Sequence, residues 1–132
     1  MYYRRKTTSK YHSQKTIVDG ITFDSRKEAR RYRELKTMEK AGMITGLELQ
    51  KKFLLLPAQF EPDRIDFSKS KKGRHISGKL IEHEVAYYAD FYYYDCLAGE
   101  WVVEDTKGVR TPEYIIKRKM LLWFHHIRIR EV

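Results

Sequence analysis

Residues 100–108, with the sequence EWVVEDTKG, form an apolar run that ends in two carboxylates and a lysine. The apolar part has the composition of a buried strand. Burying an unpaired charge inside a protein costs free energy, so Glu104, Asp105 and Lys107 need partners or solvent where this strand ends. The run therefore predicts a strand that crosses the core and places an acid and an amine together at its end.

The stretch before this run is a second strand candidate. Residues 83–94 are dense in Val, Tyr and Phe, and residues 95–99 are typical of a turn, so the two runs are predicted to form a hairpin. Asp90 interrupts the apolar run, and hairpin pairing brings it near Asp105. Two carboxylates within a few Å repel each other and raise one pKa unless a cation lies between them. The pair indicates a shared proton or a divalent metal, and oxygen ligands suit Mg²⁺ or Mn²⁺.

A third acid lies on a predicted helix near the start of the chain. Residues 16–23 are predicted to form a short hairpin around an Asp-Gly turn, and a helix follows from its N-cap Ser25 to Gly42. Glu28 precedes Tyr32 by four positions, which places its carboxylate on the apolar face of the helix. Glu28 is therefore a candidate site residue or the partner of Ser25 in a capping box, and both roles are compatible.

The remaining segments complete a mixed pattern of helices and strands. Residues 47–56 are strand-like and end at Pro57, and residues 61–79 are predicted to form a long basic loop. A helix is predicted over residues 111–124, with a closing strand over residues 126–131. The chain is thus predicted to be an α/β (α+β) protein, with a mixed central sheet flanked by helices in the order αβββαβ.

The length of the chain is that of a single domain. With 132 residues, one core is expected, and we assign it to residues 15–132. Residues 1–14 are basic with little apolar content, so they are predicted to form a flexible arm.

The composition indicates a polyanionic partner. The chain has 27 basic and 18 acidic residues, a formal net charge of +9, which is typical of proteins that bind nucleic acid. A membrane surface is the alternative, but the sequence has neither a basic amphipathic helix nor an apolar run of about 18 residues. Cys96 is the single cysteine and no signal peptide opens the chain, so we expect the cytoplasm.

Five segments combine into a larger pattern: residues 18–25 with the following Glu28, 49–53, 88–91, 103–108 and 114–119. An acid on a helix, an acid within a strand, an Asp-x-Lys at the end of the next strand, and then a basic helix resemble the PD-(D/E)xK nuclease superfamily. More closely, the chain is similar to small phage-encoded endonucleases of that superfamily, once catalogued as a domain of unknown function and related to Holliday junction resolvases. The resemblance covers roughly residues 15–132.

The resemblance implies a restriction-endonuclease-like core and metal-dependent hydrolysis of DNA phosphodiester bonds. It makes Asp90 and Asp105 ligands of Mg²⁺ or Mn²⁺, Lys107 the catalytic lysine, and Glu28 a further ligand or a water-bridged acid. The second acid is Asp rather than the commoner Glu, and Glu104 is adjacent to it on the opposite face by strand parity. A β-bulge would allow Glu104 to take the ligand role instead.

Contacts to DNA are assigned to the basic loop, the second helix and one strand. Gln50 either orients the site or is an ordinary exposed strand residue, and Lys117 either reaches a phosphate or belongs to a solvated basic face. The residues predicted to contact DNA are Gln50, Lys69, Lys71, Lys72, Arg74, Tyr114, Lys117 and Lys119.

The leading hypothesis is a structure-directed endonuclease that acts on branched DNA as a homodimer, in the cytoplasm of a bacterial host if a phage encodes it. A less structure-selective phage nuclease of replication, recombination or packaging is the first alternative. A non-catalytic nucleic-acid-binding protein with the same basic surface is the second.

Overall fold

The computed structural model of the protein describes residues 14–132, so the arm predicted over residues 1–14 lies outside the described residues except for Gln14. In chain order the elements are β1 (Thr16–Val18), β2 (Ile21–Phe23), α1 (Arg26–Lys40), β3 (Ile44–Leu56), β4 (Gln59–Phe60), β5 (Arg64–Asp66), β6 (Arg74–Ile76), β7 (Leu80–Glu82), β8 (Val85–Asp95), β9 (Glu100–Asp105), α2 (Pro112–His125) and β10 (Ile129–Glu131).

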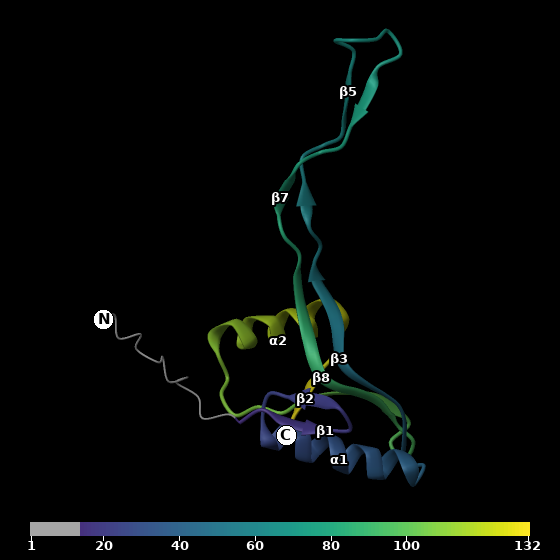
Figure 1. Ribbon diagram of the computed structural model, residues 1–132, viewed down its shortest axis with the longest axis vertical. Helices are drawn as coiled ribbons and strands as arrows, with labels where there is room; N and C mark the ends of the chain where they lie inside the picture. Colours follow the sequence, from purple (N-terminus) through teal and green to yellow (C-terminus); the bar gives the residue numbers. More distant parts are fainter. Residues whose placement is uncertain (1–13) are drawn as a thin grey trace, which may run out of the picture.

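The main sheet has the strand order β10-β9-β8-β3 (Figure 1). β8 pairs antiparallel with both β3 and β9, whereas β10 pairs parallel with β9. Successive residues of β9 point to opposite faces, so Val102 lies in the core beneath α1 and Val103 in the core beneath α2. The sheet is therefore mixed and flanked by helices, which confirms the predicted α+β class and the second hairpin.

The two helices begin at the residues that the sequence predicts. The Ser25 hydroxyl accepts a hydrogen bond from the Glu28 N–H at 3.1 Å, and the Thr111 hydroxyl accepts one from the Tyr114 N–H at 3.2 Å. Each cap satisfies a backbone donor that has no partner within its helix. The β1–β2 hairpin is also confirmed, and residues 19 and 20 of its turn both have positive φ.

Three predicted boundaries shift in the structure. β3 begins at Ile44 rather than Leu47, β8 begins at Val85 rather than His83, and β10 begins at Ile129 rather than His126.

Neither α1 nor α2, the helices of residues 14–132, is long and apolar enough to cross a membrane.

The predicted basic loop over residues 61–79 is wrong in one respect, because it contains the paired strands β5 and β6 and is flanked by the paired strands β4 and β7. Figure 1 shows this two-stranded ribbon extending far from the helices as a continuation of β3 and β8. Backbone groups of two paired strands satisfy each other without a core, so polar composition does not prevent pairing. We call residues 59–82 the arm from here on; they are distinct from the N-terminal segment of residues 1–14.

Glycine allows the strands of the arm to approach closely. An added Cβ on Gly78 would lie 1.6 Å from the Glu61 carbonyl oxygen. Two hydrogen bonds lie next to this close approach of Gly78 and Glu61. The Glu61 N–H donates to the Lys79 carbonyl at 2.8 Å, and the Gly78 N–H donates to the Asp63 carboxylate at 2.8 Å. These contacts order the base of the arm without buried apolar side chains.

Candidate active site

A cleft of about 460 Å³ lies where β8 and β9 meet the beginnings of both helices. Its lining includes Glu28 from α1, Asp90 from β8, Asp105 from the end of β9, and Lys107 from the loop that follows. We call this cleft the acid pocket. The structure thus brings together all four residues that the sequence analysis assigned to the catalytic site.

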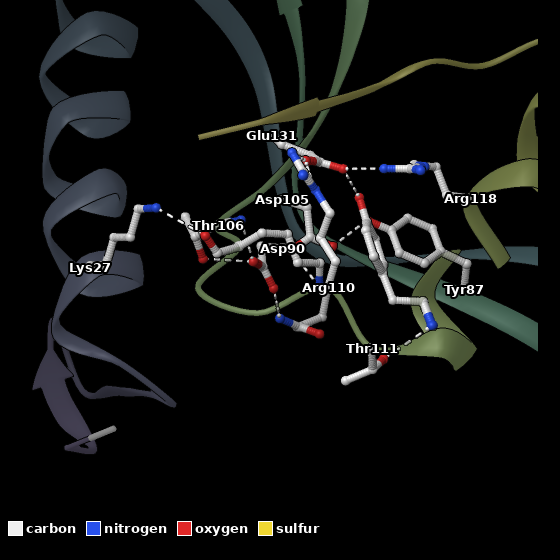
Figure 2. A network of polar contacts seen from close by, with 12 residues as sticks. Lys27, Tyr87, Asp90, Asp105, Thr106, Arg110, Thr111, Arg118 and Glu131 are labelled. Carbon is white, nitrogen blue, oxygen red and sulfur yellow. Dashed lines mark hydrogen bonds and ion pairs between the residues drawn. The ribbon is translucent and has the colours of Figure 1, made fainter. Parts of the chain in front are cut away.

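Asp105 is the most unusual group of the acid pocket. It is 2% exposed, and its Oδ2 accepts a short hydrogen bond from the Tyr87 hydroxyl (Figure 2). Lys107 Nζ lies 2.9 Å from Oδ1 but is not aligned to donate a hydrogen bond, so Oδ1 is the one buried side-chain oxygen or nitrogen of residues 14–132 without such a bond. A buried carboxylate oxygen of this kind retains its capacity to bind a ligand.

Asp90 lies beside Asp105 and is held by a different set of donors. Its Oδ2 accepts hydrogen bonds from the Thr106 N–H and hydroxyl, both at 2.8 Å. Burial and then the charge of Asp105 raise the pKa of Asp90, whereas the Thr106 donors oppose that shift. The two carboxylates therefore repel each other at close range, as the hairpin predicted.

Gln50 lies opposite Asp90 on β3. Its Nε2 donates to Asp90 Oδ1 at 3.3 Å, and its φ of 50° is rare for a residue other than glycine. Along β8 the buried side chains pack under α2 up to Ala89 and under α1 from Phe91 onward. Asp90 and Gln50 thus lie at the point along β8 where packing changes from α2 to α1. The strained backbone of Gln50 is therefore next to the candidate ligand Asp90.

Glu28 completes the acidic side of the pocket from the first turn of α1. It is 8% exposed, and burial followed by the charges of Asp90 and Asp24 raises the pKa of Glu28 to about 7. The Ser25 hydroxyl caps the Glu28 N–H, so the backbone of Glu28 serves the helix while its carboxylate faces the other acids. The Ser25 half of the predicted capping box is confirmed, and the role of the Glu28 carboxylate at the site stays a prediction.

The acid pocket lies at the N-terminal ends of both helices, because Ser25 and Thr111 are the two N-caps and both line it. The partial positive charge of a helix N-terminus favours anions. Sequence patterns identify each cap separately, but they do not show that the two caps share one cleft.

The carboxylates of the acid pocket are its candidate ligands for a cation. Within residues 14–132 no group of three or more His, Cys, Asp or Glu side chains is arranged to hold a metal ion. Asp90 and Asp105 nevertheless supply two adjacent carboxylates, one with a buried oxygen that lacks a hydrogen bond. Hard oxygen donors of this kind fit Mg²⁺ or Mn²⁺, which usually keep several waters and take few protein ligands.

Lys107 lies beyond the end of β9, yet its ammonium group returns to the pocket. Nζ lies 4.1 Å from the ring centroid of Tyr114, in addition to its contact with Asp105. Tyr114 is 6% exposed, and its hydroxyl donates to Glu131 at 2.8 Å. The structure therefore places Tyr114, a predicted DNA contact, in the core as a support for Lys107.

Glu131 anchors this side of the site (Figure 2). It accepts hydrogen bonds from Arg110, Tyr114 and Arg118, and these donors, led by Arg110, lower the pKa of Glu131 to about 2. The sequence analysis missed Arg110 and Glu131. Only the parallel pairing of β10 with β9 brings residue 131 beside the site.

Glu104 does not replace Asp105 at the site. It is completely buried on the α1 side of the sheet and accepts hydrogen bonds from Arg31 Nε at 2.5 Å, Arg31 Nη2 at 3.0 Å and the Tyr93 hydroxyl at 2.7 Å. The β8–β9 register is continuous through Glu104, so no bulge reverses its direction. The proposed exchange of the two acids is wrong.

The other predicted DNA contacts lie away from the acid pocket. Lys117 pairs with Glu113 at 2.9 Å and lines a separate groove between α2 and β8, and Lys119 is exposed on α2. Four further cations lie at the tip of the arm, where none of them pairs with a carboxylate of residues 14–132: Lys69, Lys71, Lys72 and Arg74.

Comparison with known proteins gives a family without a described activity. The family described as "Protein of unknown function (DUF1064)" matches residues 8–131. No curated protein and no solved structure matches the chain. Since the family match spans nearly the whole sequence, the chain belongs to the DUF1064 family.

Proposed function

We propose that this protein is a metal-dependent DNA endonuclease that hydrolyses phosphodiester bonds. The observation that carries the proposal is the state of Asp105: its Oδ1 is buried without a hydrogen bond, beside the half-buried carboxylate of Asp90 and a lysine. The order α1-β3-β8-β9-α2-β10 supports a restriction-endonuclease-like core, which the resemblance to PD-(D/E)xK nucleases implies.

In this proposal Asp90 and Asp105 hold Mg²⁺ or Mn²⁺, and Glu28 is a further or water-bridged ligand. When bound, the cation polarises the scissile phosphate and lowers the pKa of a water molecule. Lys107 provides positive charge where the phosphate becomes more negative in the transition state. Tyr87 and Thr106 keep the two aspartates in place by donating to one oxygen of each carboxylate.

The arm supports a preference for branched DNA. Its tip carries four cations without carboxylate partners in residues 14–132, on a two-stranded ribbon that projects from the sheet (Figure 1). A β-ribbon fits the major groove or the open centre of a junction, and phosphate contacts provide affinity. The proposal includes a homodimer, since two symmetric sites allow paired nicks, and a cytoplasmic location in a bacterial host.

The test is cleavage of labelled four-way junction, flap and linear duplex DNA in Mg²⁺ or Mn²⁺. We expect symmetric nicks in the junction, and we expect Asp105→Asn to lower the rate by at least about a thousandfold while DNA binding persists. Glu100→Gln, at the exposed opposite end of β9, is the matched control and should cleave normally. Binding without any metal-dependent cleavage by the wild type would refute the nuclease proposal.

A non-catalytic nucleic-acid-binding protein is the second candidate, and the lack of a three-residue metal group in residues 14–132 favours it. Asp90→Ala separates the two functions. In a binding protein, removing this negative charge leaves DNA affinity unchanged or increases it, and there is no cleavage to lose. In the nuclease, the same substitution abolishes metal-dependent cleavage. A less selective nuclease would instead cleave linear duplex as fast as the junction.

A further inference from the structure

A second pocket of about 600 Å³ lies directly beside the acid pocket. Four residues line both cavities: Lys27, Lys107, Gly108 and Val109. The second cavity adds Arg110 and the end of β10, and we call it the basic pocket. An added Cβ on Gly108 would meet nothing within 4 Å, so the backbone between the two pockets faces open space.

Two elements bring cations to the basic pocket. Lys27 comes from the first turn of α1, and its Nζ donates to the Lys107 carbonyl at 3.2 Å. Arg110 comes from the loop between β9 and α2, and Figure 2 shows Lys27 reaching from α1 toward this loop. The cations thus come from a helix and a loop, and the hydrogen bond from Lys27 to the Lys107 carbonyl connects these two elements.

The acidic side chain in the lining of the basic pocket already has partners. Glu131 accepts from Arg110, Tyr114 and Arg118, whereas Asp105 lines the acid pocket instead, with its Oδ1 beside Lys107 Nζ. Glu131 contacts Nε and Nη2 of Arg110, which leaves the other guanidinium N–H donors free for a ligand. Lys27 has no carboxylate partner in residues 14–132. The pocket therefore presents oriented donors and positive charge.

We propose that the basic pocket binds a phosphate group of a nucleic-acid strand, adjacent to the phosphate that lies at the acid pocket. The inference rests on the proposed function for the path of the strand. Lys27 and Arg110 donate to the non-bridging oxygens, and the open backbone at Gly108 lets the strand pass from one pocket to the other. Because the basic pocket lies on one side of the acid pocket, it defines on which side of the cut the strand is held.

The experiment measures binding alone, so it does not depend on cleavage. The full chain, labelled with ¹⁵N, is titrated without metal with the dinucleotide TpT, with its uncharged methylphosphonate analogue, and with thymidine 5′-monophosphate. We expect the amide signals of residues 108–110 to shift with the charged ligands and to stay in place with the analogue. TpT reports an internal phosphate and the monophosphate reports a strand end.

The Lys27→Ala/Arg110→Ala double variant should weaken this binding by about tenfold, as expected for the loss of charge-assisted hydrogen bonds. The matched control is Lys40→Ala/Arg128→Ala, which removes two exposed cations from the last turn of α1 and from the segment before β10. Equal shifts with the uncharged analogue, no shifts at residues 108–110, or equal weakening by the control would overturn the inference. If the shifts occur but no DNA is ever cut, the phosphate pocket stands and the nuclease proposal fails.

Discussion

In the body of the protein, the buried carboxylates of Glu104 and Asp105 lie against cations, whereas the cations at the tip of the arm have no carboxylate partner in residues 14–132. Arg31 pairs with Glu104, and Lys107 lies against Asp105. Lys71 and Lys72, between β5 and β6, are exposed without such pairs. Charge in the body is therefore part of the folded structure, while charge in the arm is available to a ligand.

Apolar side chains follow the same division. The body buries Phe91, Tyr93 and Leu121 almost completely, but Phe60, with 58% exposure, and Phe67, with 61%, lie open on the arm or near its tip. Burial of large apolar groups stabilises a fold by about 2 kcal/mol for each side chain, and the exposed phenylalanines of the arm do not contribute this stabilisation. The arm is therefore ordered by backbone pairing and by close contacts at glycine rather than by a core.

The largest effect on stability is expected from Arg31→Met in the body. This change leaves the buried Glu104 without its cation, which should lower the free energy of unfolding by about 3 kcal/mol. Urea unfolding measures the loss. Arg33→Met, at an exposed position of the same helix, is the control and should change stability by less than about 0.5 kcal/mol. Equal losses in both variants would mean that the buried pair is not what distinguishes the body.

The arm should respond in its ligand binding and not in its stability. Replacing Lys69, Lys71 and Lys72 together by Ser should reduce the salt dependence of DNA binding by about three phosphate contacts and lower the affinity by about tenfold. The melting temperature should stay unchanged, because these side chains make no ion pairs within residues 14–132. Fluorescence anisotropy at several salt concentrations measures the slope, and preserved preference for a junction over linear duplex would argue against the role of the arm.

The smallest expected effect concerns pH. Hydrogen bonds from Arg110, Tyr114 and Arg118 lower the pKa of Glu131 from 4.5 to about 2. Because the folded state lowers this pKa, the stabilisation is complete above the unfolded value and disappears as the pH falls through the folded value. Solvent screens the ion pair with the exposed Arg110, and the Gln amide oxygen still accepts hydrogen bonds, so Glu131→Gln should cost only about 1 kcal/mol near neutral pH and almost nothing below about pH 2. Unfolding at a series of pH values measures this difference, and a cost independent of pH would contradict it.

Much of the site could be predicted because it depends on short-range patterns. Asp105 and Lys107 are two positions apart, Asp90 lies across a short hairpin, and Glu28 follows an N-cap by three positions. Alternation along a strand and spacing along a helix are local properties, so the faces of these residues follow from the order of the chain.

The groups that sequence analysis missed depend on contacts between distant segments. Lys27 reaches the carbonyl of Lys107, 80 positions away, and Glu131 enters the site only through the parallel β9–β10 pair. The arm was predicted as a loop because its composition is polar, and composition says little about a ribbon that needs no core. The choice between Asp105 and Glu104 also needed the structure, since a single bulge would have exchanged them.

Local sequence patterns were sufficient to predict the helix caps, the hairpins and the four candidate catalytic residues of the acid pocket, because these depend on local backbone preferences and on the spacing of apolar residues. The folded arrangement was needed to see that two helix N-termini share that pocket, that Glu104 pairs with Arg31 on the opposite face, and that a basic pocket adjoins the acids. The physical reason is that electrostatic and packing contacts act through space, and the positions they join are set by how the helices and the sheet assemble.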